Sequence, residues 1–172
     1  MFKKLFSVVL FVALSFGAQA QFVFDEGDIA INAGVGFFSM DGTLPSLYLS
    51  AELGLIPTND IGVLSIGGVM EHKYSKVSGQ YYNQASIAPR IIWHFHFPFL
   101  DKTKFDLYTG LGSGLHHYRD YNLTTFVFDR KITPYMEFFI GGRMIIGDRL
   151  GVFVEAGANA MAVLKFGAAY RL

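Results

Sequence analysis

The sequence has no cysteine and no excess of either charge, since 14 Lys and Arg residues balance 14 Asp and Glu residues. The absence of cysteine excludes disulfides and thiolate metal sites. The balanced charge gives no basic field for nucleic acid, so no nucleic-acid partner is expected. Hydrophobic residues nevertheless make up 52% of the chain, and the mean hydropathy is +0.35. A chain this apolar needs an apolar surrounding, which the remaining features must identify.

Beyond the first twenty residues there is no long hydrophobic run, because Glu, Arg, His or Gly interrupts every apolar stretch. A helix needs about 20 apolar residues to cross a bilayer, so spanning helices are not expected. Residues 1–20 carry Lys3 and Lys4, an apolar run from 5 to 16 and small residues before Ala20. This pattern predicts a secretory signal peptide cleaved after Ala20. The remaining 21–172 form a single domain, with 12 cationic against 14 acidic residues.

Eight segments alternate apolar and polar residues with the period of a β-strand. They span 28–38, 46–56, 61–71, 81–97, 105–116, 132–146, 151–159 and 161–172. The connections after the second, fourth and sixth segments are short, and those after the first, third and fifth tend to be longer. Short turns at one end and longer loops at the other are typical of bacterial outer-membrane barrels. Pro89 cannot donate a ladder hydrogen bond, so a bulge or a different register is expected there.

The last segment favours a closed barrel. One of its faces remains apolar to the end of the sequence, through Leu164, Phe166, Tyr170 and Leu172. An unpaired apolar edge invites aggregation, and a barrel removes it by pairing the last strand with the first. Taken alone, this strand is equally compatible with a β-sandwich.

Three arrangements therefore compete: a lipid-facing barrel, a lipocalin-like soluble barrel and a sandwich. Charge placement favours the first, because six matched charges lie near mid-strand on the polar faces. An Arg or Lys facing lipid at the bilayer midplane costs roughly 2–4 kcal/mol, so these charges must point inward. We expect them to form a network of ion pairs across a narrow lumen; they are Glu52, Arg90, Glu137, Arg143, Glu155 and Lys165.

The predicted signal peptide, the eight segments, the glycine-rich polar face with Leu111-Gly-Ser-Gly114 and the closing strand resemble the small outer-membrane barrels of the OmpA/OmpX type. Leu172 departs from the phenylalanine with which such chains often end. The resemblance implies an all-β, eight-stranded antiparallel up-and-down transmembrane β-barrel in the outer membrane of a Gram-negative bacterium. It also implies contact with outer-membrane lipid or lipopolysaccharide and insertion by the barrel-insertion machinery through the closing strand. A monomer without cofactor is expected.

Candidate chemistry is sparse. His94 and His96 have a spacing that can hold a metal, but no third ligand is evident, and hydrogen bonding to lumenal carboxylates is the preferred interpretation. Ser113 and His117 resemble the serine and histidine of outer-membrane lipid A deacylases, without a carboxylate partner at matching spacing. The aromatic and charged segment Tyr118–Lys131 is suited either to binding a surface partner or to extending its flanking strands into a hairpin, which we favour.

These observations predict a structural or envelope-integrity role, or a surface-interaction role of the adhesion type, with no open pore and no enzymatic activity. The first alternative is a secreted, soluble lipocalin-like barrel that binds an apolar ligand. The second is a hydrolase that modifies lipid A.

Overall fold

The computed structural model describes residues 24–38, 45–77, 80–97, 104–122, 127–159 and 161–172. The predicted signal peptide, 1–20, and its cleavage site lie outside these ranges. A 3₁₀ turn, η1 (Asn59–Ile61), lies between the second and third of eight strands. The strands are β1 (Ile29–Phe37), β2 (Ser46–Pro57), β3 (Gly62–Val77), β4 (Gln80–Phe95), β5 (Phe105–Asn122), β6 (Val127–Ile145), β7 (Leu150–Ala158) and β8 (Leu164–Arg171).

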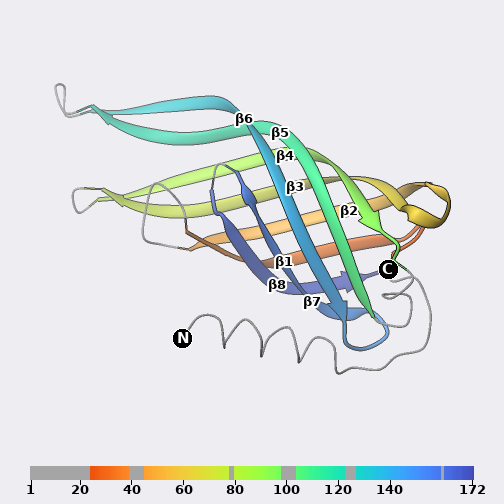
Figure 1. Cartoon of the computed structure of the whole chain (residues 1–172). Coiled ribbons are helices and arrows are strands. Elements are labelled where there is room, and N and C mark those ends of the chain that lie inside the picture. Colours follow the sequence, from red (N-terminus) through yellow and green to blue (C-terminus); the bar gives the residue numbers. More distant parts are fainter. Residues whose placement is uncertain (1–23, 39–44, 78–79, 98–103, 123–126, 160) are drawn as a thin grey trace, which may run out of the picture.

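The eight strands form one closed barrel in which each strand pairs with its neighbours along the chain (Figure 1). All the pairs are antiparallel, and β1 closes the ring against β8 with Ala33 opposite Ala168 and Val35 opposite Phe166. Closure leaves no strand edge in the wall, which is how a barrel satisfies its backbone without water. The predicted up-and-down, eight-stranded topology is confirmed. No helix of the described ranges is long and apolar enough to cross a bilayer.

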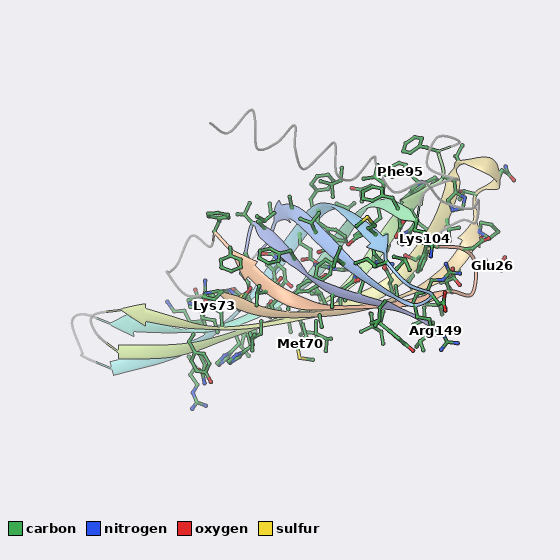
Figure 2. The ribbon with its side chains drawn as sticks, turned by 90° about the horizontal axis from the view of Figure 1, so that it is seen from below. Glu26, Met70, Lys73, Phe95, Lys104 and Arg149 are labelled. Atoms are coloured by element: carbon green, nitrogen blue, oxygen red, sulfur yellow. The ribbon has the colours of Figure 1, made fainter. Side chains whose placement is uncertain are left out.

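The two ends of the barrel differ. Strands β3 to β6 have 16 to 19 residues, whereas the other four have 8 to 12, and the longer strands project as two hairpins at one end (Figure 1). We call this the hairpin end. The opposite end, the turn end, carries η1, the β6–β7 turn and the C-terminus. Lys73 lies where the hairpins begin to project, and Glu26, Lys104 and Arg149 lie at the turn end (Figure 2).

The projecting hairpins correct one sequence prediction and bear on another. The alternating segments 61–71 and 81–97 predict a polar connecting loop over 72–80, but β3 continues to Val77 and β4 starts at Gln80. Above the barrel a hairpin has no apolar face to maintain, so the hydrophobic alternation fades while the backbone ladder continues. The favoured hairpin interpretation of Tyr118–Lys131 agrees with the backbone, in which Asn122 of β5 pairs with Val127 of β6. The side chains of 119–129 lie outside the description.

The wall of the barrel is apolar outside and polar inside. Leu49, Ile91 and Phe138 are 46%, 59% and 56% exposed on the outer face, whereas Glu52 and Arg90 are 5% and 2% exposed. Strand alternation explains the sorting, because successive side chains point to opposite sides of the sheet. A soluble lipocalin-like barrel would place the apolar face inside, and the structure shows the reverse.

The register around Pro89 is regular, and the bulge expected there is not found. Pro89 pairs with Gly68 of β3, and the β4–β5 ladder resumes after Pro89 in the register that it had before it. The proline therefore interrupts the ladder on one side only. A register shift occurs instead between Gly54 and Ile56 in the β2–β3 pair.

The last strand begins later than expected, at Leu164 rather than Met161. Met161 and Ala162 are buried and Val163 is exposed, the reverse of the sides that the alternation predicted for the last two. The cause is a turn at Asn159, whose side-chain Oδ1 accepts hydrogen bonds from the backbone N–H groups of Met161 and Ala162, both at 2.8 Å.

Candidate functional site

The barrel interior, or lumen, contains the charged residues that the sequence singled out. The six predicted network residues are all buried there, together with three further charged residues and His94. Among the described residues the buried acids number five and the buried lysines and arginines four, so the charges balance when His94 carries a proton. The acids are Glu52, Glu71, Asp106, Glu137 and Glu155, and the cations are Lys73, Arg90, Arg143 and Lys165.

Arg90 of β4 organises the centre of the lumen. Its guanidinium makes a two-pronged contact with Glu137 of β6, with Nε donating to Oε1 at 2.6 Å and Nη2 donating to Oε2 at 3.1 Å. Its Nη1 donates to the Tyr48 hydroxyl at 2.7 Å and lies 3.3 Å from Glu155. The Tyr48 and Tyr108 hydroxyls donate to the Glu155 carboxylate at 2.9 and 3.2 Å. One cation thus joins strands from opposite parts of the ring.

Glycines of the inner face make room for this cluster. A Cβ atom at Gly112 would lie 2.8 Å from Cγ of Glu137, and one at Gly141 would lie 2.8 Å from the Tyr108 hydroxyl. Both distances are shorter than van der Waals contact. Small residues beside large ones therefore fill the narrow interior of an eight-stranded barrel.

A second cluster lies toward the turn end, around Arg143 of β6. Arg143 pairs with Glu52 of β2 and lies 3.4 Å from Asp106 of β5. His94 of β4 stands between the same two carboxylates, with Nδ1 donating to Asp106 at 3.0 Å and Nε2 3.4 Å from Glu52. The Ser65 hydroxyl is 3.1 Å from Nε2. The Tyr108 ring lies beside both His94 and Arg143 and links this cluster to the central one.

Phe24, which precedes β1, covers this second cluster. Its ring stacks on the His94 ring with a centroid distance of 3.9 Å, and its carbonyl accepts a hydrogen bond from Nε2 of His96 at 3.0 Å. The following residues are fixed to β2, since Gly27 N–H donates to the Gly54 carbonyl at 3.0 Å. Phe24 is 1% exposed, so the segment closes the turn end of the lumen.

A third cluster lies toward the hairpin end, around Glu71 of β3. Lys165 of β8 reaches Glu71 at 2.9 Å and Glu155 at 3.9 Å, so it joins this cluster to the centre. Asn159 donates from Nδ2 to Glu71 at 2.7 Å, and its turn places Met161 in a buried position near this end. Residues that lie outside the strands are therefore buried near both ends of the lumen.

Sequence reasoning identified the face but not all of its members. Glu71 and Asp106 occupy lumen-facing positions of the alternation, which was the available signal; they were left out because they lie near predicted strand ends. Phe24 was missed for another reason, because it precedes the first alternating segment and no periodicity marks it as lumenal. Met161 begins the last predicted segment on the lumen side of the alternation, but it is apolar and was not assigned to the charged network.

The candidate metal and hydrolase residues are not assembled into sites. His94 and His96 have separate partners, and no group of three or more His, Asp or Glu able to hold a metal is found in the described part of the chain. Ser113 and His117 lie on the same strand, β5, four residues apart. At about 3.3 Å per residue their Cα atoms are roughly 13 Å apart, which is too far for a serine–histidine hydrogen bond.

The sequence matches no protein-family model, and no curated protein matches it. The solved structures that resemble the barrel include two of Ail, the attachment invasion locus protein of Yersinia pestis, one of them a complex with the heparin analogue sucrose octasulfate. Their TM-scores are 0.55 and 0.53, and each is 12% identical to this chain. Each comparison covers 86% of this chain and 99% of the other.

At this identity the likeness concerns the fold. It confirms the predicted resemblance to small outer-membrane barrels at that level and agrees with the apolar outer face and charged lumen. The chain therefore has the fold of an eight-stranded antiparallel transmembrane β-barrel.

Proposed function

We propose that the protein spans the outer membrane of a Gram-negative bacterium as a monomeric barrel with no open pore, and that it acts in envelope integrity or surface interaction. The observation that carries the proposal is the sorting of side chains across the wall. Aliphatic and aromatic residues cover the outer face, and ion pairs occupy the lumen. In water the outer face would be a large exposed apolar surface, which is unfavourable. In a bilayer the same face contacts lipid hydrocarbon.

The lumen supports the part of the proposal that concerns the pore. Arg90, Glu137 and Glu155 meet at its centre, Phe24 covers the turn end and Met161 is buried near the hairpin end. A conducting path would require these buried ion pairs to separate inside a low-dielectric wall, at high energetic cost.

In this proposal the closing strand directs insertion of the barrel into the membrane. Phe166 and Leu172 are exposed on the outer face of the last segment, and Leu164 and Tyr170 lie on the same side at intermediate exposure. This is the apolar stripe that the barrel-insertion machinery would recognise after the signal peptide, 1–20, has been removed in the periplasm. The turn end would then face the periplasm and the hairpin end the exterior.

The surface role is assigned to the hairpin end. Four strands project there, and their polar residues continue the backbone ladder outside the membrane. The solved Ail structures support an adhesive role by analogy, because that protein is named for attachment and invasion and was captured with a sulfated sugar analogue. The segment Tyr118–Lys131 is the proposed contact with a surface partner.

Cell fractionation with protease shaving tests this function. Overexpressed protein should appear in the outer-membrane fraction, require detergent, and migrate faster on gels before heating than after. External protease should cut within the projecting hairpins and leave the turn end intact. A water-soluble protein in the periplasm or medium would instead support the lipocalin-like alternative, and stable large conductance from the pure protein would contradict the closed lumen.

A further inference from the structure

His94, in the cluster at the turn end of the lumen, belongs to a chain of three groups that resembles the catalytic triad of hydrolases. Its Nε2 lies 3.1 Å from the Ser65 hydroxyl, and its Nδ1 lies 3.0 Å from the Asp106 carboxylate. In a hydrolase the histidine takes the proton of the serine, which requires an unprotonated Nε2. The role of His94 therefore depends on which of its ring nitrogens carry hydrogen.

The neighbours of His94 place a hydrogen on both ring nitrogens. An ionised carboxylate only accepts, so Nδ1 donates to Asp106. The Ser65 hydroxyl donates its single hydrogen to the Ile92 carbonyl at 3.3 Å, which leaves its oxygen to accept from Nε2. The Glu52 carboxylate, another acceptor, is 3.4 Å from the same nitrogen. A ring that donates from both nitrogens is an imidazolium, which has no lone pair to activate a serine.

The charges around the ring favour the same protonation state. Glu52 and Asp106 share the guanidinium of Arg143. A protonated His94 supplies a second positive charge beside these two carboxylates, whereas a neutral ring would leave one buried negative charge uncompensated at high energetic cost. Over the whole described lumen, five buried acids and four buried lysines and arginines also require one further positive charge.

The imidazolium also holds Phe24 in place. The Phe24 ring stacks on the His94 ring at a centroid distance of 3.9 Å and an interplanar angle of 19°, so its aromatic face lies against a cation. The Arg143 guanidinium lies 5.7 Å from the centroid of the same ring. Asp25 and Glu26, which follow Phe24, are exposed. The Phe24 side chain is therefore the part of this segment that enters the lumen.

We propose that His94 is a proton-dependent latch, in which the imidazolium holds Phe24 over the turn end of the lumen and loss of one ring proton to solvent releases the segment. A neutral ring would leave Glu52 and Asp106 sharing one cation and would remove the cationic partner of Phe24. The closed turn end is therefore favoured at low pH and weakened as the pH rises. The groups that face the ring are Glu52 from β2, Ser65 from β3, Asp106 and Tyr108 from β5, Arg143 from β6 and Phe24.

The inference rests on the proposed closed lumen and names the group that controls one end of it. In the proposed orientation the turn end faces the periplasm, so the latch would respond to the pH on that side of the membrane. The outer-membrane location and the surface role do not depend on it. Fractionation and protease shaving of cells test those separately, so a failed latch in a correctly located barrel would contradict this inference alone.

Nuclear magnetic resonance of the histidine rings measures the protonation of His94 directly. The mature chain is folded in non-ionic detergent with ¹⁵N in its backbone and histidine rings, and His94→Gln identifies the His94 signals. At pH 7 both ring nitrogens should carry hydrogen. The Gly27 N–H donates to the Gly54 carbonyl and reports attachment of the Phe24 segment to β2. As the pH is raised to 10, the Gly27 amide signal should change together with loss of the His94 proton.

Three results of this titration would overturn the proposal. One is a His94 ring with an unprotonated nitrogen at pH 7. Another is a Gly27 amide that does not follow the loss of the His94 proton. The third is a ring that keeps both hydrogens up to pH 10, because such a group could not act as a switch.

A glutamate-specific protease measures release of the segment. Glu26 lies at the turn end (Figure 2) and is the one glutamate of the sequence outside the lumen. The other glutamates are Glu52, Glu71, Glu137 and Glu155, all buried. At pH 7, cleavage after Glu26 should be about tenfold faster in His94→Gln than in wild type, because glutamine cannot supply the positive charge. His72→Gln, which changes a half-buried histidine of the outer face, should be cut at the wild-type rate.

A second substitution separates the loss of charge from the loss of the ring. Adding Asp106→Asn to His94→Gln removes the uncompensated carboxylate, so cleavage after Glu26 should return most of the way to the wild-type rate. A double variant that is cut faster than His94→Gln would mean that the wild-type ring is neutral. That result, or equal cleavage of wild type and His94→Gln, would contradict the latch.

Labelling of Ser65 by a fluorophosphonate would also overturn the proposal, since it would show that His94 acts as a base. Ser65→Ala controls for labelling elsewhere in the chain. Heat-modifiable migration verifies that each variant is folded before protease or probe is added.

Discussion

Arg90 and Ile91 follow each other on β4, yet they belong to two different environments. Arg90 is buried in the lumen among two carboxylates and a tyrosine hydroxyl, and Ile91 is exposed among other aliphatic side chains. The inner surface is held together by specific partners, so each of its residues depends on others across the ring. The outer surface needs only to be apolar. A substitution on the inner surface should therefore lower the stability of the barrel because it leaves a buried partner without its ion pair or hydrogen bond. A substitution on the outer surface should lower it when it introduces a polar or charged group.

The largest effect is expected from Arg90→Ala. The change leaves Glu137 and Glu155 buried without their main cation, and breaking a buried pair in this way costs about 3–5 kcal/mol. Urea unfolding of the purified barrel in detergent measures the loss. Arg171→Ala is the matched control, because that residue forms a partly exposed pair with Asp28 at 3.4 Å and should cost less than about 1 kcal/mol.

A second substitution separates lost pairing from lost volume. Adding Glu137→Gln to Arg90→Ala removes one of the stranded charges and should recover part of the stability. If the double variant is no more stable than Arg90→Ala, the cost comes from packing, and the ion-pair account of the lumen is wrong.

Truncation of Phe24 tests whether this side chain closes the turn end of the lumen to water. Phe24→Ala should cost about 3 kcal/mol, as for other buried aromatics, and should admit water to the cluster around His94. The chain has no cysteine, so Ser65→Cys beside His94 reports access to a water-soluble thiol reagent without background. Labelling of that cysteine should be slow when Phe24 is present and fast in the Phe24→Ala variant.

The reciprocal experiment uses the other end. Ser46→Cys lies beside Glu71 near the hairpin end and should become accessible with Met161→Ala, but not with Phe24→Ala. If either truncation exposes both cysteines equally, the ends do not close independently and the lumen opens as a unit.

On the outer surface, Ile91→Arg should destabilise the barrel in lipid by roughly 2–4 kcal/mol. Leu150→Arg provides the depth control, since Leu150 is exposed at the turn end, where β7 begins, and the expected cost there is about 0–1 kcal/mol. Unfolding in lipid vesicles measures both variants. Equal costs at the two positions would mean that Ile91 does not face the bilayer midplane.

The smallest effect is expected from Asn159→Ala. The turn loses two hydrogen bonds from backbone N–H groups and one bond to Glu71, which together resemble the loss of a capping residue and cost about 1 kcal/mol. Asn159→Asp keeps the acceptor atom but puts a second carboxylate beside Glu71. The Asn159→Asp variant should be less stable than Asn159→Ala in the same unfolding assay. If Asn159→Asp is the more stable of the two, the Asn159 side chain stabilises the barrel through the turn and not through its hydrogen bond to Glu71.

Much of the architecture could be predicted from local pattern. The six charges of the predicted network, Glu52, Arg90, Glu137, Arg143, Glu155 and Lys165, were assigned to the inner face because a pleated strand sends alternate residues to opposite sides. Strand boundaries were less accurate where the pattern had no apolar face to mark them. The hairpins reach Val77 and Asn122, because a ladder outside the membrane can be built from polar residues.

The sequence by itself determined which face of each strand meets lipid, that six of the inner charges are matched in sign, and that the last strand must find a partner. Only the tertiary structure decided that Arg90 binds Glu137, that Lys165 binds Glu71, and that Phe24 and Met161 are buried near the ends of the lumen. The physical reason is the distance in sequence over which each feature is set. Alternation is set by adjacent residues of one strand, whereas the partner of a lumenal side chain depends on the register of every ladder between the two strands around the ring.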